Sequence, residues 1–159
     1  MYSAVVITSS DRAYEGIYED KSGPLLKEML ERAGYSVRES LILPDEEEMI
    51  YDKLILVTGE LKPDVIFTTG GTGFSERDRV PEATIRACDR MAPGIAEAIR
   101  AYSMQYTKKA MLSRAVSGIK DRTIIINLPG SPKAVKECLE LVIPVLSHGI
   151  DILRGEGEK

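Results

Sequence analysis

Cysteine and histidine are scarce in this sequence, which disfavours several kinds of site. The 159 residues include two cysteines, Cys88 and Cys138, and one histidine, His148. The cysteines form no Cys-x-x-Cys pair, so we expect reduced thiols and a cytoplasmic protein. A chain of this length buries roughly 70% of its unfolded surface, so a core can form without disulfides or metal ions. We expect His148 to be a packed or surface residue, which makes Cys-His and Ser-His-Asp sites poor hypotheses.

Long apolar runs are also missing. The longest apolar stretch lies within residues 138–153, where charged residues, a proline and His148 interrupt it. A membrane helix needs about 20 consecutive apolar residues. The apolar run near the N-terminus ends too early for a signal peptide. The sequence therefore predicts a soluble protein with no membrane partner.

Positive charge is not in excess. There are 21 Lys and Arg against 25 Asp and Glu, for a net charge of -4, which argues against a nucleic-acid partner. With 43% apolar and 29% charged residues, the composition is that of a globular protein and excludes collagen-like, coiled-coil and low-complexity classes. The charges are uneven, since residues 45–48 are all acidic and five basic residues fall within 108–122. Such runs usually form solvated faces, although the basic stretch can also bind an anion.

Apolar segments of two kinds alternate along the chain. Short β-branched runs predict strands, and apolar positions three or four apart predict helices. The predicted strands are residues 2–8, 36–43, 65–69 and 123–126; the predicted helices are residues 24–33, 49–61, a helix starting at 81–83, 93–104 and 131–147. This order predicts one domain over residues 1–159, a three-layer αβα sandwich with a mostly parallel sheet and right-handed crossovers.

The loops after four predicted strands are the places to search for a site. In open α/β sheets, ligands bind beyond the carboxyl ends of the strands. These ends are Thr8, Leu43, Thr69 and Asn127, and each is followed by polar residues or glycine.

The strongest local signal is the sequence T-T-G-G-T-G at residues 68–73. Glycines after a strand let the backbone turn sharply and present free N–H groups to an anion. The pattern is neither a G-x-G-x-x-G dinucleotide fingerprint nor a Walker A loop. The alternative interpretation is a tight turn with no ligand.

Two aspartates follow predicted strands. Asp78, five residues beyond Gly73, suits a Mg²⁺ ion held jointly with substrate phosphates, or else an Asx turn. For Asp45 the residues alone favour a helix N-cap, with Glu48 as its capping-box partner.

A second loop rich in proline and glycine follows the predicted strand at 123–126. Residues 128–132 read L-P-G-S-P and lead into a helix, whose N-terminus attracts phosphate. Lys108, Lys109, Ser113 and Arg114 can add cationic and hydroxyl contacts, or simply keep the surface polar.

Read together, these segments resemble the molybdopterin adenylyltransferase family, which includes bacterial enzymes and the G domains of plant and animal fusion proteins. The resemblance covers nearly the whole chain in order. The matching segments are residues 7–12 with Gly16 and 20–21, 43–46, 69–73, 77–78 with 81–84, 112–114 and 127–132.

The resemblance implies an enzyme that transfers AMP from ATP to the terminal phosphate of molybdopterin and releases pyrophosphate. It implies that Asp45 and Asp78 are a catalytic, magnesium-binding pair, which reverses the preference for a cap at Asp45. The loop at 70–73 and Ser113 would hold the pterin and its phosphate, and residues 128–132 would line the nucleotide side. The substrate-binding residues predicted in all are Ser9, Asp11, Thr69, Gly70, Gly71, Thr72, Gly73, Ser113, Arg114, Leu128, Pro129, Gly130, Ser131 and Pro132.

Two alternative functions belong to related families. MoaB-like proteins resemble the chain equally in fold and in the Gly-Gly-Thr-Gly loop, and a member that only carries molybdopterin would use no ATP. The nucleotide pyrophosphatase domain of competence-damage proteins departs in the loop sequence and ranks lower. Asp45 and Asp78 favour an active enzyme. The resemblance also implies a homo-oligomer, a trimer or a hexamer, and a molybdenum-insertion protein as a partner.

Overall fold

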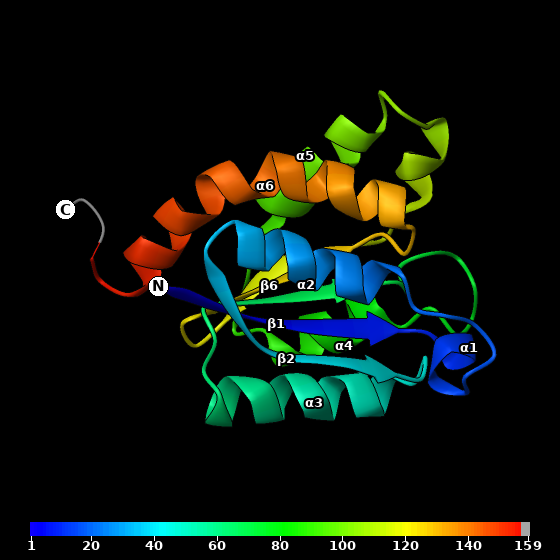
Figure 1. Cartoon of the computed structure of the whole chain (residues 1–159), viewed down its shortest axis with the longest axis horizontal. Helices are drawn as coiled ribbons and strands as arrows, with labels where there is room; N and C mark the ends of the chain where they lie inside the picture. Colours follow the sequence, from blue (N-terminus) through cyan, green and yellow to red (C-terminus); the bar gives the residue numbers. More distant parts are fainter. Residues whose placement is uncertain (157–159) are drawn as a thin grey trace.

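A computed structural model describes residues 1–156. Its centre is a six-stranded sheet with helices on both faces (Figure 1). The strands are β1 (Tyr2–Ser9), β2 (Tyr35–Leu43), β3 (Val65–Thr69), β4 (Arg90–Met91), β5 (Ser117–Lys120) and β6 (Thr123–Leu128). The helices are α1 (Asp11–Tyr14), α2 (Ser22–Arg32), α3 (Glu47–Glu60), α4 (Val80–Ala87), α5 (Pro93–Ser103), the 3-10 helix η1 (Lys108–Leu112) and α6 (Pro132–Leu153). None of the helices in this range is long and apolar enough to cross a membrane.

Alternating residues of the central strands divide the core into two parts. Val6 and Phe67 point to one face of the sheet, which α2, α5 and α6 cover. Val5 and Ile66 point to the other face, against α3 and α4 (Figure 1). Because both faces are covered, apolar residues follow one another in these strands without polar alternation. The three-layer α/β fold predicted from the sequence is confirmed.

The strand order indicates where a ligand is expected to bind. The order is β2-β1-β3-β6-β5-β4, in which the first four strands are parallel and β5 pairs antiparallel with both β6 and β4. The chain moves outward from β1 to β2 and then crosses back to β3, so the order reverses between β1 and β3. In open α/β sheets, ligands bind at this switch point, here between Ser9 and Gly70.

Most boundaries agree with the sequence predictions. Strand β3 has the predicted bounds, α2 begins two residues before the predicted helix, and Gly34 has the positive φ of +93° expected of a C-cap glycine. The predicted loop at 9–21 instead contains the single turn α1, and α6 continues six residues past the predicted end at 147. The short antiparallel strands β4 and β5 were not predicted.

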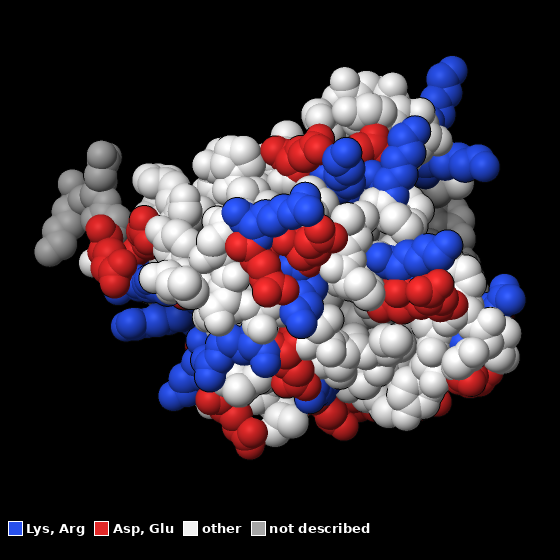
Figure 2. Space-filling model, viewed as in Figure 1, with Lys and Arg blue, Asp and Glu red and all other residues white. Residues whose placement is uncertain are grey.

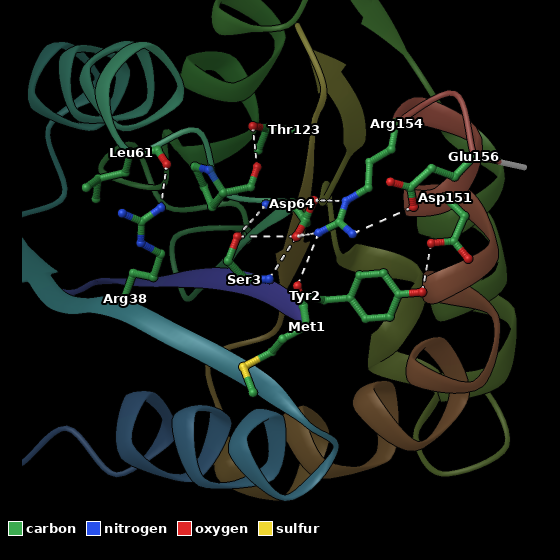
Figure 3. Close-up of polar contacts among 11 residues, drawn as sticks. Met1, Tyr2, Ser3, Arg38, Leu61, Asp64, Thr123, Asp151, Arg154 and Glu156 are labelled. Carbon is green, nitrogen blue, oxygen red and sulfur yellow. Dashed lines mark hydrogen bonds and ion pairs between the residues drawn. The ribbon is translucent and has the colours of Figure 1, made fainter.

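A polar network fastens the end of α6 to the start of the sheet (Figure 3). The Asp64 carboxylate, at the start of β3, accepts hydrogen bonds from Nε and Nη2 of Arg154 at 2.9 and 2.6 Å. It also accepts one from the backbone N–H of Ser3 at 2.8 Å. The Arg154 guanidinium lies 5.0 Å from the ring centre of Tyr2, whose hydroxyl donates to Asp151. The network lies at the opposite end of β3 from Gly70.

Replacing Arg154 with alanine is expected to lower the free energy of unfolding by about 2 kcal/mol, because Asp64 is buried and would lose its cation. Urea denaturation measures this change. Arg122→Ala is the control, since Arg122 is exposed on the same edge, and its effect should stay within about 0.5 kcal/mol. Equal effects of the two substitutions would show that the ion pair adds no stability.

Candidate functional site

Three loops meet at the carboxyl edge through glycines. Gly70 has φ +87°, and a Cβ atom on it would lie 2.5 Å from the carbonyl oxygen of Ser9. A Cβ on Gly130 would lie 3.4 Å from the Cα of Gly70. The Gly70 N–H donates to the Leu128 carbonyl, and the Thr69 hydroxyl donates to the Pro129 carbonyl at 2.6 Å. The loops after β1, β3 and β6 are therefore in backbone contact, and we call the Gly70–Gly130 contact the glycine saddle.

Asp45 is not the N-cap that its local sequence predicted. The N-cap of α3 is Glu46, whose side chain makes no capping hydrogen bond. The Asp45 carboxylate instead accepts hydrogen bonds from the Ser9 hydroxyl at 2.5 Å and from the Asp11 N–H at 3.0 Å. In return, the Asp45 N–H donates to Asp11. These contacts turn the carboxylate toward the β1 loop and the glycine saddle.

Asp11 connects this arrangement to the loop after β3. Its carboxylate accepts two hydrogen bonds from the Arg77 guanidinium, both at 2.9 Å. The bonds from Arg77 hold the pKa of Asp11 below its ordinary value. Arg77 precedes Asp78, so this ion pair positions the loop that carries the second predicted catalytic aspartate.

Asp78 lies over the glycine loop. Its Oδ2 accepts a hydrogen bond from the Ser75 N–H at 3.0 Å and would lie 2.9 Å from a Cβ on Gly73. The Ser9 hydroxyl that binds Asp45 would lie 3.1 Å from a Cβ on Gly71. The two aspartates therefore flank the turn at residues 71–73, where the absence of side chains leaves room for a ligand.

Arg114 holds the loop that carries Asp78 in place. Its guanidinium donates to the carbonyls of Gly73 and Asp78 at 2.8 and 2.7 Å and to the Glu82 carboxylate at 2.6 Å. The hydrogen bonds from Arg114 lower the pKa of Glu82. These contacts make Arg114 a positioning residue in this structure, and its predicted contact with substrate stays a prediction.

Replacing Glu82 with glutamine is expected to lower the free energy of unfolding by about 1 kcal/mol near neutral pH, because the pair is bidentate and only about one third exposed. The folded-state pKa of Glu82 lies below its ordinary 4.5, so the pair stabilises fully above about pH 4.5 and loses this effect as pH falls through the lower value. Urea denaturation across this pH range should therefore show wild type and variant converging in acid.

The control for this prediction is Glu28→Gln, which breaks a pair whose side chains are 77% and 55% exposed. Its effect should stay below about 0.5 kcal/mol. A difference between wild type and Glu82→Gln that persists unchanged in acid would contradict the role of the ion pair.

Two cavities open on either side of the glycine saddle. The larger, of about 490 Å³, lies between the turn at 72–74, α5, η1 and the start of α6, and its lining includes Arg100, Lys109, Ser113 and Ser131. The smaller, of about 150 Å³, lies between the β1 loop and the start of α2. Figure 2 shows several Lys and Arg side chains in the upper right of the molecule, and Arg100 and Lys109 are the basic residues that line the larger cavity. This cavity therefore suits an anionic ligand.

The start of α6 adds to the positive character of the larger cavity. Ser131 caps the helix, its hydroxyl accepting a hydrogen bond from the Ala134 N–H at 3.2 Å. A 22-residue helix presents the positive end of its dipole at this point.

The carboxylate oxygens of Asp45 and Asp78 are of the chemical type that magnesium prefers as ligands. Both oxygens of Asp45 and one of Asp78 accept single hydrogen bonds, so both carboxylates retain lone pairs. Among residues 1–156, no group of three or more His, Cys, Asp or Glu side chains is arranged to hold a metal ion. Mg²⁺ usually binds one or two carboxylates and completes its shell with substrate phosphates and water. These residues therefore suit an ion that binds together with a phosphorylated substrate.

Residues 5–148 match the model of the family described as "Probable molybdopterin binding domain". The chain belongs to this family. It is 43% identical over 152 residues to the molybdopterin adenylyltransferase of Helicobacter pylori strain 26695, covering 94% of this chain and 86% of that protein. It is 40% identical over 151 residues to the molybdopterin adenylyltransferase of Escherichia coli K12, covering 91% and 77%. The crystal structure of the molybdopterin biosynthesis enzyme MoaB from Thermus thermophilus superposes with a TM-score of 0.92, at 40% identity and full coverage of both chains.

The structure brings most of the predicted site residues to the carboxyl edge of the sheet. Ser9, Asp11 and Asp45 lie on one side of the turn at 71–73, and Asp78 and Arg114 lie on the other. Leu128 contributes only its backbone, because its side chain is buried in the core. The remaining predicted residues line the two cavities or border them: Thr69, Gly70, Gly71, Thr72, Gly73, Ser113, Pro129, Gly130, Ser131 and Pro132.

Sequence reasoning missed several residues at this edge. Arg77 and Glu82 hold the loops, and Arg100 lines the larger cavity while donating to the carbonyls of Ser113 and Ala115. Arg77 and Glu82 stand within a segment that matched the family, but only the fold shows their partners.

Proposed function

We propose that this chain is a molybdopterin adenylyltransferase that transfers AMP from ATP to the terminal phosphate of molybdopterin. Its identity of 40 to 43% to enzymes with that name, over more than nine tenths of the chain, carries the proposal. The two cavities on either side of the glycine saddle support it, because the reaction brings two substrates together at their phosphates.

Molybdopterin occupies the larger cavity in this proposal. Lys109 and Arg100 balance negative charge there, and the N–H groups at the start of α6 and of residues 71–73 receive phosphate oxygens. Ser113 adds a hydroxyl at the cavity wall. The nucleotide approaches from the other side of the saddle, so that the reacting phosphates meet over Gly70 and Gly71.

The chemistry requires no nucleophile from the protein. An oxygen of the molybdopterin phosphate forms a bond to the α-phosphorus of ATP, and the bond from that phosphorus to the oxygen of the departing pyrophosphate breaks. The protein holds the two phosphates in line and places N–H donors against the charge that develops. When bound, Mg²⁺ would be held by Asp45 and Asp78 and would neutralise phosphate charge.

Release of pyrophosphate tests this function. The purified chain is incubated with molybdopterin, ATP and Mg²⁺, and with each of the three omitted in turn. We expect pyrophosphate only in the complete mixture. Molybdopterin binding without pyrophosphate release would show a carrier, and pyrophosphate release without molybdopterin would show a nucleotide pyrophosphatase.

We infer further that the chain acts as a homo-oligomer, a trimer or a hexamer, in the cytoplasm, and passes its product to a molybdenum-insertion protein. An apolar groove of about 490 Å³ between α5 and α6 supports self-association, since it includes Val145, which is 66% exposed. Light scattering should give at least three times the 17.5 kDa of one chain. A monomer would contradict the oligomer.

A further inference from the structure

A further cavity, of about 430 Å³, opens at the amino ends of the parallel strands, and we call it the amino-end cavity. It lies between the end of α3, the residues before β3, the turn between β5 and β6 and the end of α6, and its lining includes Lys62, Arg122 and Arg154. Because β3 has five residues, about 16 Å of strand separates this cavity from the glycine saddle. The amino-end cavity is therefore separate from the candidate active site.

The cations of the amino-end cavity have hydrogen-bond donors to spare. Arg154 binds Asp64 through Nε and Nη2 (Figure 3), but its Nη1 lies 4.0 Å from Oε2 of Glu156, which is too far for a hydrogen bond. Within residues 1–156, Lys62 and Arg122 form no ion pair. The cavity therefore presents positively charged donors that these residues of the chain do not use.

Lys62 stands where glycine would be more stable. It follows the C-cap of α3, its N–H donates to the Val57 carbonyl, and its φ is +49°. Glycine is the usual residue at such a position, because a side chain is strained at positive φ. Strained residues of this kind gather at ligand sites. A lysine at this position therefore indicates that its charge is used.

The size of the amino-end cavity favours a ligand larger than a single phosphate. Sites for small molecules typically have volumes of about 300 to 1,000 Å³, and this cavity falls within that range. A guanidinium group binds phosphate oxygens in pairs, and a lysine ammonium binds them as a point charge. Three such groups around one cavity can contact neighbouring phosphates of the same ligand.

We propose that Lys62, Arg122 and Arg154 bind a small anion with two or more linked phosphate groups, such as pyrophosphate or the triphosphate of a nucleotide. Arg154 receives the ligand through Nη1, so its two hydrogen bonds to Asp64 remain. The site does not depend on the proposed function, because it lies at the other end of β3 and shares no residue with the candidate active site.

Titration with pyrophosphate in the absence of metal ions, followed by NMR, tests this site. The backbone amide signals of residues 121–123 report on the amino-end cavity, and those of residues 71–73 report separately on the candidate active site. We expect the signals of 121–123 to shift and saturate, and pyrophosphate to bind there at least about fivefold more tightly than phosphate. Tighter binding of ATP than of pyrophosphate would assign a nucleotide, and the reverse would assign free pyrophosphate. Either result supports the site.

Two substitutions should weaken this binding. Lys62→Gly and Arg122→Ala are each expected to weaken pyrophosphate binding at the amino-end cavity at least about fivefold, because each removes one charged donor. Lys62→Gly should also raise the melting temperature without ligand by about 2 °C, because glycine relieves the strain at positive φ. The response of residues 71–73 should stay as in wild type, which shows that the variants keep the fold.

Two further variants control for charge. Lys136→Ala makes the same change in net charge at an exposed residue of α6 and should leave binding within about twofold of wild type. Asp121 also lines the amino-end cavity, and its carboxylate repels an anion. Asp121→Asn should therefore tighten pyrophosphate binding about threefold, since asparagine also tolerates the φ of +54° at this position.

Three results would overturn the site. The first is that pyrophosphate leaves the signals of residues 121–123 unshifted in wild type. The second is equal affinity for phosphate and pyrophosphate, because the cations would then attract any anion. The third is unchanged binding in both Lys62→Gly and Arg122→Ala. None of these results bears on AMP transfer, so the proposed function stands or fails separately.

Discussion

Asp78→Asn is expected to lower kcat for AMP transfer at least about 100-fold while molybdopterin binding changes less than about threefold. Asp78 lies over the turn at 71–73, and its Oδ2 accepts the Ser75 N–H. An asparagine oxygen can still accept that hydrogen bond, so the loop keeps its conformation and only the negative charge is lost. Asp78→Ala removes both, and we expect the same loss of transfer with retained pterin binding.

Steady-state kinetics and equilibrium binding of molybdopterin measure the two effects separately. Glu76→Gln is the matched control, because Glu76 is an exposed acid in the same loop, and its kcat should stay within about twofold. Unchanged turnover in Asp78→Asn would refute a catalytic role for this aspartate.

Gly70→Ala is expected to lower the free energy of unfolding by about 3 kcal/mol and to abolish transfer. A φ of +87° is strained for alanine, and the added Cβ would press against the Ser9 carbonyl oxygen at 2.5 Å. That oxygen belongs to the backbone of β1, so the clash can be relieved only by moving the strand or the loop. The saddle between the two cavities would then be distorted.

Gly59→Ala provides a control of opposite sign for urea denaturation. Gly59 lies in the last turn of α3 with open space around it, so alanine should raise the free energy of unfolding by about 0.5 to 1 kcal/mol. Similar effects of the two substitutions would show that Gly70 is not under the steric constraint described.

The elements that the sequence predicts well are those whose signals are local. The run at 65–69 contains no charged residue and is buried throughout because both faces of β3 are covered, and glycines follow it where the chain must turn at positive φ. The strands β4 and β5 lack such a signal. Gly118 lies within β5, where glycine weakens the local strand signal. A Cβ there would lie 2.7 Å from the sulfur of Cys88, so close packing explains the glycine, and only the fold shows this packing.

The candidate site is predictable in outline only. Asp45 follows a strand and precedes a helix, so the same residues describe either a cap or a site acid. What decides against the cap is its hydrogen bond with Ser9, 36 residues earlier in the chain. Likewise, the sequence shows Thr8 only as one more β-branched strand residue. The structure shows that its hydroxyl is buried and makes no hydrogen bond within residues 1–156. Partnerships over such separations depend on strand order, which periodicity does not specify.

The fate of the α-phosphate of ATP tests the proposed reaction most directly. The chain is incubated with molybdopterin, Mg²⁺ and ATP labelled at the α-phosphate, and the labelled products are separated. We expect label on the pterin in an amount equal to the pyrophosphate released. Label that appears only as free AMP, or that stays in ATP while molybdopterin is bound, would contradict adenylyl transfer.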